Sequence, residues 1–283
     1  MDSAEYIVVG SGRLAYQCAE AIRKKEKDVI VLEYKIAEVS VLKKMCHSKG
    51  ICYNCFNKRD MTDYLSHIDT PKMVFSVMNT YLFPDSVIHN RFLEIINAHN
   101  SILPQHPGRN AEAWEIFDED EKTAITWHKV SAQVDGGGIL LQELFDIPED
   151  ITAINLLALQ NQIQLKTFNK VFDMVETRNF TFQEQQSYGT YPVHYSRDVP
   201  NGGELDLDWP ISKIWAFLRA MDYGPLQILG NPFLVFEDKK YVWDAYEKTE
   251  TDGSEEGIVQ DQDTFMITKG NSAIKLIGIK EAA

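Results

Sequence analysis

The opening of the chain alternates between short apolar runs and an amphipathic stretch that begins at a glycine turn. A strand-like run covers 6–9, the turn at 10–15 reads Gly-Ser-Gly-Arg-Leu-Ala, apolar residues then recur at helical spacing, and a second apolar run at 29–32 ends in Glu33. This pattern predicts a βαβ unit. Further helical and strand-like segments follow near residues 37–49, 51–53, 73–78 and 94–98. The repeated alternation predicts an α/β fold with a doubly wound, mostly parallel sheet, in which ligands bind beyond the carboxyl ends of the strands.

The glycine turn fits the Gly-x-Gly-x-x-Ala form of a dinucleotide fingerprint. Glu33 stands where that fingerprint has its acid, about 20 residues further on. An NAD-dependent oxidoreductase is therefore one hypothesis for this chain. The same glycines also serve wherever a strand turns tightly into a packed helix, in proteins that bind no nucleotide.

The cysteines raise the question of a metal site. Cys46-His47 and Cys52-x-x-Cys55 offer three thiols and an imidazole, which is a conceivable zinc set. The gap from Cys46 is short for a zinc ribbon, there is no second Cys-x-x-Cys, and Cys52 falls in a strand predicted to be buried. We therefore predict reduced thiols and no metal site.

Charge and hydropathy narrow the class of partner. With 28 Lys and Arg against 42 Asp and Glu, the formal net charge is -14, which disfavours a nucleic-acid partner. No apolar run approaches the roughly 20 residues that span a bilayer, and the first ten residues lack the basic and apolar regions of a signal peptide. These features predict a cytoplasmic protein with no membrane partner.

The segment from residue 94 to 142 carries the residues best suited to chemistry. Asn97 and His99 are two apart on a predicted strand, so their side chains leave one face of the sheet at the strand's carboxyl end. Downstream, Asp135 precedes three glycines, which allow a ligand or another backbone to approach closely and allow a positive φ. Each residue alone also suits an ordinary turn. Their joint occurrence predicts a catalytic set of Asn97, His99 and Asp135.

The block Asn-x-His-x-Ser-Ile-Leu-Pro at residues 97–104, followed by Asp135-Gly136-Gly137, resembles the folate-dependent formyltransferase family. That family includes methionyl-tRNA formyltransferase, nucleotide-sugar N-formyltransferases and the formylation domains of peptide synthetases. Asn100 replaces the family's usual proline, and Asp-Gly-Gly-Gly replaces its distal Asp-Thr-Gly-Asp, a change that bears on the loop over the acceptor. The resemblance implies a Rossmann-like catalytic domain and an enzyme whose cosubstrate is 10-formyltetrahydrofolate.

The resemblance and the demands of formyl transfer together suggest a role for each member of the set. Attack of a neutral amine on the formyl carbon creates an oxyanion and a cationic nitrogen. Asn97 would donate to the oxyanion, and His99 would share it and polarise the carbonyl. Asp135 would orient or charge the imidazole and accept the amine's proton, directly or through water. His128, in a predicted strand at 125–130, either faces the acceptor or is a hydrogen-bonded sheet histidine.

The resemblance also suggests which residues surround the two substrates. Residues 77–84 lie where the family's folate loop wraps the pterin ring, in an apolar pocket with a few polar atoms. The predicted cofactor-binding residues are Met78, Asn79, Tyr81, Leu82, Phe83, Leu103, Val134 and Gly136. The predicted acceptor-binding residues are Arg13, Ser101, Arg109, Asn110 and Trp114. Both arginines suit a phosphate or carboxylate, whereas Tyr81 and Trp114 are equally at home in a core.

The resemblance extends more weakly into the second half of the chain. Residues 1–180 are predicted to form the catalytic domain. Asp-Leu-Asp-Trp at 206–209 resembles the opening of the second domain of the methionyl-tRNA enzyme, and the β-rich stretches at 233–246 and 257–280 resemble its barrel, shortened. We therefore predict that residues 181–283 form a linker and a small β-rich, barrel-like C-terminal domain.

The amine acceptor is the least constrained part of the hypothesis. A nucleotide-linked amino sugar is the leading choice, because family members of this size commonly act on one and the acidic charge disfavours tRNA. An aminoacyl group on a carrier protein and a small amino acid stay open, as does a catalytically silent binding protein. The resemblance makes a homodimer plausible, although no residue demonstrates one.

Overall fold

The computed structural model describes residues 4–34, 40–186, 191–253 and 256–282. The chain divides into two compact units, each assembled from three stretches. The first unit comprises Met1–Gly108, Ala124–Phe145 and Leu159–Val193, and the second comprises Arg109–Thr123, Asp146–Ala158 and His194–Ala283. The domain boundary after residue 180 stays a prediction.

The first unit is built on a seven-stranded sheet in the order β3-β2-β1-β4-β5-β6-β7. The strands are β1 Tyr6–Gly10, β2 Val29–Tyr34, β3 Cys52–Phe56, β4 Lys72–Val77, β5 Leu93–His99, β6 Lys122–Lys129 and β7 Ile139–Asp146. The first five strands pair in parallel, and β6 pairs antiparallel with β5. The predicted α/β fold with a mostly parallel sheet is therefore confirmed.

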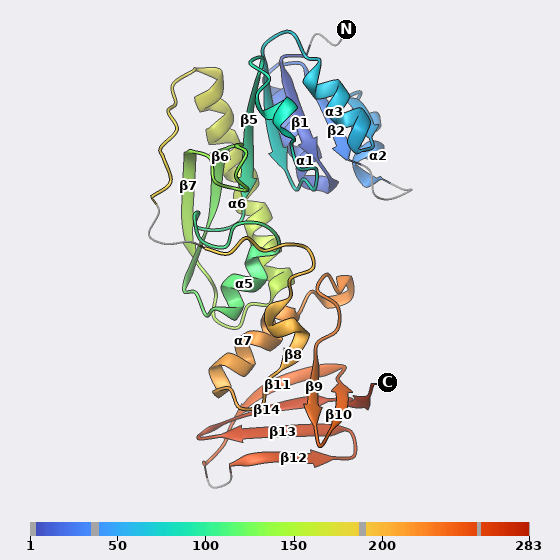
Figure 1. Cartoon of the computed structure of the whole chain (residues 1–283), viewed down its shortest axis with the longest axis vertical. Coiled ribbons are helices and arrows are strands. Elements are labelled where there is room, and N and C mark those ends of the chain that lie inside the picture. Colours follow the sequence, from blue (N-terminus) through green and yellow to red (C-terminus); the bar gives the residue numbers. More distant parts are fainter. Residues whose placement is uncertain (1–3, 35–39, 187–190, 254–255, 283) are drawn as a thin grey trace. The chain divides into compact units, whose positions relative to one another are not determined.

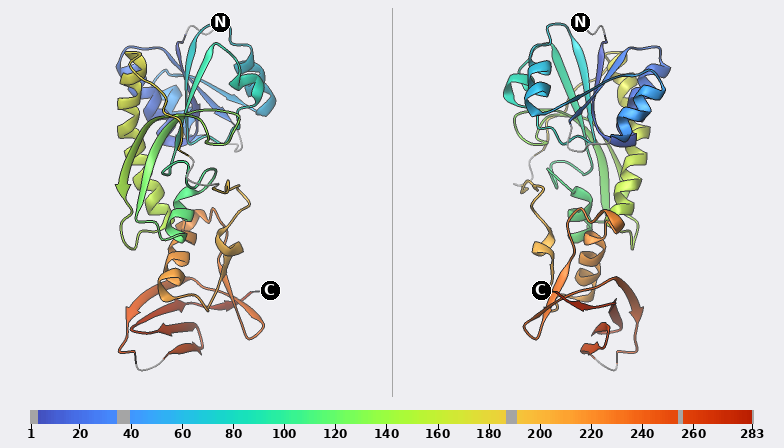
Figure 2. Two further views of the ribbon diagram at one scale, coloured as in Figure 1. Left: turned by 60° about the vertical axis from the view of Figure 1, so that its left-hand side comes forward. Right: turned by 90° about the vertical axis from the view of Figure 1, so that its right-hand side faces the viewer.

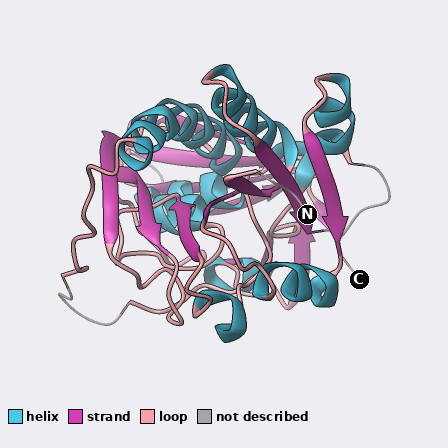
Figure 3. Cartoon of the chain, turned by 90° about the horizontal axis from the view of Figure 1, so that it is seen from above, coloured by secondary structure: helices cyan, strands magenta, loops and turns pink. Residues whose placement is uncertain are grey.

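Helices cover both faces of this sheet (Figure 3). The helices packed on it are α1 Gly12–Lys24, α2 Val41–Ser48, α3 Lys58–Ser66, α4 Asp85–Ile88 and α6 Ala153–Glu176, of which α6 begins in the second unit. The apolar residues of α1, α2 and α6 form one core cluster with one face of the strands, and those of α3 and α4 form another with the opposite face. Because the central strands are covered on both sides, β1 and most of β2 are buried, as expected for a parallel sheet.

The long helix α6 lies along β6 and β7 (Figure 2). Trp127 on β6 is fully buried, and its indole Nε1–H donates to the hydroxyl of Thr167 on α6 at 2.9 Å. The ring of Trp127 also contacts that of Phe168, with centroids 5.8 Å apart. These contacts hold the antiparallel edge of the sheet, which carries part of the site.

The second unit contains two helices and two four-stranded sheets. The helices are α5 Ala111–Phe117 and α7 Ile211–Met221, and Pro200–Gly203 and Gly224–Leu226 form short 3-10 turns. One sheet has the order β15-β10-β9-β8 and the other β11-β14-β13-β12. The strands are β8 Glu204–Leu205, β9 Phe233–Phe236, β10 Lys239–Val242, β11 Ala245–Glu250, β12 Gly257–Asp261, β13 Thr264–Lys269, β14 Ser272–Ile277 and β15 Lys280–Glu281. The predicted β-rich character of the C-terminal part is confirmed.

Candidate active site

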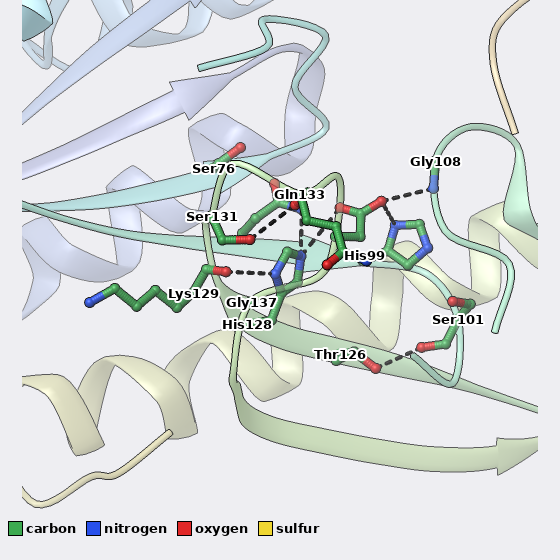
Figure 4. Close-up of polar contacts among 12 residues, drawn as sticks. Ser76, His99, Ser101, Gly108, Thr126, His128, Lys129, Ser131, Gln133 and Gly137 are labelled. Atoms are coloured by element: carbon green, nitrogen blue, oxygen red, sulfur yellow. Dashed lines mark hydrogen bonds and ion pairs between the residues drawn. The ribbon is translucent and has the colours of Figure 1, made fainter. Parts of the chain in front are cut away.

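The structure brings the three predicted catalytic residues together at the carboxyl end of β5, where Figure 4 shows His99 and His128. Asn97 and His99 lie on β5 and leave the same face, because successive strand side chains alternate. His99 is buried, and its Nε2 lies 2.9 Å from the carbonyl oxygen of His106. A carbonyl only accepts hydrogen bonds, so Nε2 carries a hydrogen, and Nδ1 faces the Oδ2 atom of Asp135 at 3.5 Å.

Asp135 sits between two imidazoles and a backbone amide. Its Oδ2 accepts a hydrogen bond from the Gly108 N–H at 2.8 Å, and its Oδ1 lies 3.4 Å from His128 Nε2. Burial alone would raise the pKa of Asp135, but the facing imidazole of His99 and the hydrogen bond from the Gly108 amide outweigh it and hold that pKa below its usual range. The site therefore contains a carboxylate that stays ionised at neutral pH.

Backbone geometry explains the glycines that follow Asp135. Asp135 itself has a φ of 49°, whereas none of the next three glycines has a positive φ, contrary to one of our expectations. A Cβ on Gly137 would lie 1.8 Å from the carbonyl oxygen of Lys129, so only glycine allows the loop to pack against the end of β6. Gln185 also holds this loop, because its Nε2 donates to the carbonyl oxygens of Asp135 and Gly137 at 2.6 and 2.8 Å.

His128 was weighed from the sequence but left out of the predicted catalytic set, and the structure places its ring in contact with two members of that set, Asn97 and Asp135. It lies on β6 opposite Asn97 of β5, with its Nε2 3.1 Å from Asn97 Nδ2. The Gly108 N–H was missed altogether. His128 could have been identified if the strand at 94–98 had been predicted to pair antiparallel with the strand at 125–130, because that pairing puts His128 opposite Asn97.

The turn after β5 is held by its own hydrogen bonds. Ser101 is fully buried, its hydroxyl donates to the Gln105 carbonyl at 2.6 Å, and its carbonyl accepts from the Thr126 hydroxyl at 2.6 Å. An acceptor contact by Ser101, as predicted, would require this turn to open. Leu103, a predicted cofactor residue, is likewise buried and precedes a cis peptide bond to Pro104.

The predicted folate loop contains residues of two kinds. Asn79 and Tyr81 hold the loop, because the Asn79 amide bonds the Ser76 hydroxyl and both backbone groups of Tyr81, and the Tyr81 hydroxyl lies 2.7 Å from that of Thr62. Phe83 is half-buried against the ring of Tyr81. Three predicted cofactor residues instead expose large apolar side chains to solvent: Met78, Leu82 and Val134. Gly136 lies against the Gln133 side chain.

The predicted acceptor residues divide between the two units. Arg13, at the start of α1, is exposed in the first unit. In the second, Arg109 is exposed and its N–H donates to the His194 carbonyl at 2.8 Å, while Asn110 adopts a left-handed conformation before α5. Trp114 stacks on the ring of His194, with centroids 4.1 Å apart and planes 10° apart. The structure thus joins Arg109, Trp114 and His194, and their contact with an acceptor stays a prediction.

The glycine turn is accounted for by packing. A Cβ on Gly10 would lie 2.1 Å from the Val77 carbonyl oxygen and 3.0 Å from the Ala15 Cβ, so the first glycine lets β1 and β4 run close together. Glu33 accepts a hydrogen bond from the Tyr53 hydroxyl at 2.5 Å and another from Ser40. The acid that would bind a ribose is already occupied, which argues against the NAD hypothesis.

The side chains of Cys46, Cys52 and Cys55 do not come together as a metal site would require. Cys46 is buried, but Cys52 is exposed, so the expectation that it lies in a buried strand was wrong. The reason is that β3 forms the edge of the sheet and leaves much of its surface to solvent. Within the described ranges, no three His, Cys, Asp or Glu side chains are grouped so as to hold a metal ion. Over the same ranges, no helix has the length and apolar character needed to cross a bilayer.

Comparison with known proteins identifies relatives of this chain. The family model described as Formyl transferase matches residues 17–169, more than half of the 283 residues. GDP-perosamine N-formyltransferase of Brucella melitensis biotype 1 is 29% identical over 191 residues, which cover 63% of this chain and 69% of that protein. The structure of an N-formyltransferase from Helicobacter canadensis in complex with folinic acid and dTDP-3-aminofucose matches with a TM-score of 0.77 at 15% identity, over 99% of this chain and 100% of that one. Methionyl-tRNA formyltransferase from Clostridium thermocellum matches with a TM-score of 0.60 at 15% identity, over 98% of each chain.

Proposed function

Because the chain belongs to the formyl transferase family, we propose that it moves the formyl group of 10-formyltetrahydrofolate to the amino group of a nucleotide-linked amino sugar. The observation that carries the proposal is the cluster that Asn97 and His99 of β5 form with Asp135 of the loop between β6 and β7. The acceptor class is supported by relatives named for GDP-perosamine and crystallised with dTDP-3-aminofucose.

The chemistry follows from these three side chains. The acceptor amine attacks the formyl carbon, a C–N bond forms, and the carbonyl oxygen becomes an oxyanion that Asn97 Nδ2–H and His99 Nε2–H can stabilise. The Nε2–H of His99 now donates to the His106 carbonyl, so the formyl oxygen would share or replace that bond. Collapse of the intermediate breaks the bond from carbon to N10 of the folate and releases tetrahydrofolate.

Asp135 acts chiefly through its charge. A carboxylate whose pKa lies well below the usual range is a poor holder of a proton but a good partner for a cation. It therefore stabilises the positive charge that develops on the attacking amine. The proton lost by the amine passes along Asp135, directly or through water, and the leaving N10 takes up a proton.

The exposed apolar residues near the catalytic loops suit the folate ring. Met78 and Leu82 follow β4, and Val134 directly precedes Asp135. A flat heterocycle binds best between apolar side chains with a few polar backbone groups around its edge. We assign the pterin to these side chains, while Asn79 and Tyr81 hold the loop's shape.

The acceptor's phosphates would engage Arg109. Its guanidinium is exposed, its backbone is fixed on His194, and it follows Gly108, whose N–H binds Asp135. A guanidinium suits the paired oxygens of a diphosphate, and the neighbouring Trp114 offers an aromatic surface. A carrier-bound aminoacyl group or a free amino acid would make less use of these features.

The test is amine-dependent release of tetrahydrofolate, followed by absorbance. Nucleotide-linked amino sugars, aminoacyl carriers, amino acids and Met-tRNA would be compared as acceptors. His99→Ala serves as the blank, and His89→Gln, at an exposed histidine on α4's end, serves as the matched control. We expect release with an amino-sugar nucleotide in the wild type and in His89→Gln only. Release with another acceptor alone would change the acceptor class, and no release with any amine would refute the proposal.

We propose that the protein works in the cytoplasm on small molecules, without nucleic acid. The homodimer and a carrier-protein partner stay predictions, which light scattering and the acceptor panel would test.

A further inference from the structure

His128 makes contacts that a sheet histidine does not need for packing. It is 2% exposed, and its ring touches three polar groups from three segments (Figure 4). Nδ1 lies 3.0 Å from the Lys129 carbonyl oxygen, while Nε2 lies 3.1 Å from Asn97 Nδ2 and 3.4 Å from Asp135 Oδ1. Two of these three groups belong to the catalytic set.

The hydrogen positions follow from what each partner can do. The Lys129 carbonyl only accepts, so Nδ1 must carry a hydrogen. In the neutral ring Nε2 then has a lone pair, which can accept from the Asn97 amide but repels the carboxylate. In the doubly protonated ring Nε2–H can donate to Asp135 but can no longer accept from Asn97. The two bonds of Nε2 therefore exclude each other.

We propose that His128 is a positioning residue for formyl transfer, which in its neutral form accepts one N–H of the Asn97 amide and directs the other N–H to the formyl oxygen. This inference rests on the proposed function. An amide nitrogen has two hydrogens, so one bond to His128 fixes the plane of the group and leaves one donor for the oxyanion. Asn97 lies directly across the β5–β6 pair from His128, which limits how far the amide can turn.

Protonation of His128 would reverse the arrangement. The charged and titratable groups around its ring are Asp135, His99 beyond that carboxylate, and Lys129, whose ammonium pairs with Glu94 at 2.8 Å. A proton on Nε2 would pair His128 with Asp135, release the Asn97 amide and draw the carboxylate away from His99.

Two substitutions at one position separate positioning from packing. His128→Leu removes both nitrogens at similar bulk, and we expect kcat to fall about 10- to 100-fold with KM values for both substrates changed less than about threefold. His128→Gln places an amide oxygen near the Nε2 position, so it should restore kcat to within about fivefold of the wild type.

A double-mutant cycle identifies the residue through which His128 acts. If it acts through Asn97, Asn97→Ala with His128→Leu should be no slower than Asn97→Ala alone. His89→Leu, at an exposed histidine, should leave kcat unchanged. Equal losses from His128→Leu in both backgrounds, or a loss confined to KM, would overturn the proposal.

A measurement without turnover keeps this inference separate from the proposed function. Long-range ¹H–¹⁵N spectra of the wild-type histidines should show neutral His128 with its hydrogen on Nδ1, and Asn97→Ala should shift the Nε2 resonance. The opposite tautomer, or an Nε2 signal insensitive to Asn97→Ala, would refute the positioning role even if no formyl transfer were found. If the tautomer is as expected and no amine supports release, the proposed function fails and the contact to Asn97 stands.

Discussion

The contact between Gly137 and Lys129 allows a sharp test of the loop that carries Asp135. In Gly137→Ala the new Cβ would lie 1.8 Å from the Lys129 carbonyl oxygen, so the loop and β6 must separate by more than an ångström. Gly136→Ala is the matched control, because its Cβ would meet only the Gln133 side chain, a flexible group that can move away. Neither glycine has a positive φ, so alanine strains neither backbone conformation.

The magnitude follows from the bonds that this separation breaks. The Lys129 N–H donates to the Gly138 carbonyl at 2.8 Å, and Gln185 donates to the Gly137 carbonyl at 2.8 Å. Loss of each hydrogen bond lowers the free energy of unfolding by about 1 kcal/mol, and overpacking lowers it by a further amount of about 1–3 kcal/mol. Alanine is less free than glycine in the unfolded chain, which raises the free energy of unfolding by up to about 1 kcal/mol. We expect Gly137→Ala to lower the free energy of unfolding by about 3 kcal/mol.

The assay is thermal and urea unfolding of the two variants beside the wild type. A loss of about 3 kcal/mol corresponds to a fall in Tm of about 6–12 °C for a unit of this size. Gly136→Ala should change the free energy of unfolding by less than about 1 kcal/mol. Displacing Asp135 by about 1 Å should also slow turnover about 100-fold in Gly137→Ala. Equal stability of the two variants would refute the packing argument.

Three further predictions concern the site. Asn97→Ala, His99→Ala and Asp135→Ala should each lower kcat at least about 100-fold while the circular dichroism spectrum is kept, and near-normal rates in all three would contradict the assignment. The pKa of Asp135 is lower in the folded protein than in the unfolded chain, where it is about 4, so ionised Asp135 stabilises the fold at pH values above about 4. This stabilisation is lost as the pH falls towards the pKa of Asp135 in the folded protein. The stability advantage of the wild type over Asp135→Asn in urea unfolding should therefore shrink below about pH 4, and a constant advantage would count against the depressed pKa. Arg109→Ala should raise the KM for an amino-sugar nucleotide about tenfold with kcat nearly unchanged, and an unchanged KM would show that Arg109 does not hold the phosphates.

Much of the fold was accessible from local pattern. Strand and helix periodicity predicted the βαβ opening, the parallel sheet and the β-rich C-terminal part, because those signals depend on neighbours in the sequence. The exposure of Cys52 could not be predicted in this way. Whether a strand lies at the edge or in the middle of a sheet depends on strand order, and the residues of β3 do not encode that order locally.

The residues of the candidate site also divide into those that local sequence predicts and those that it does not. Asn97 and His99 share a face through the two-residue alternation of one strand, so their proximity was predictable. His128 joins them only through antiparallel pairing with a strand more than twenty residues away, and Gly108 joins through a backbone N–H that any residue except proline carries. The missed partners are those whose role depends on register or on the main chain.

The two hydrogen bonds that Gln185 donates to the loop of Asp135 bear on the order in which the parts of the site form during synthesis. Synthesis proceeds from the N-terminus, so Asn97, His99 and Asp135 leave the ribosome well before Gln185, which follows α6 and holds the carbonyl groups on either side of Gly136. A nascent or truncated chain that stops short of Gln185 carries all three proposed catalytic side chains yet lacks the hydrogen bonds that hold the loop of Asp135. The loop that carries Asp135 is therefore fixed late, after α6 has been added.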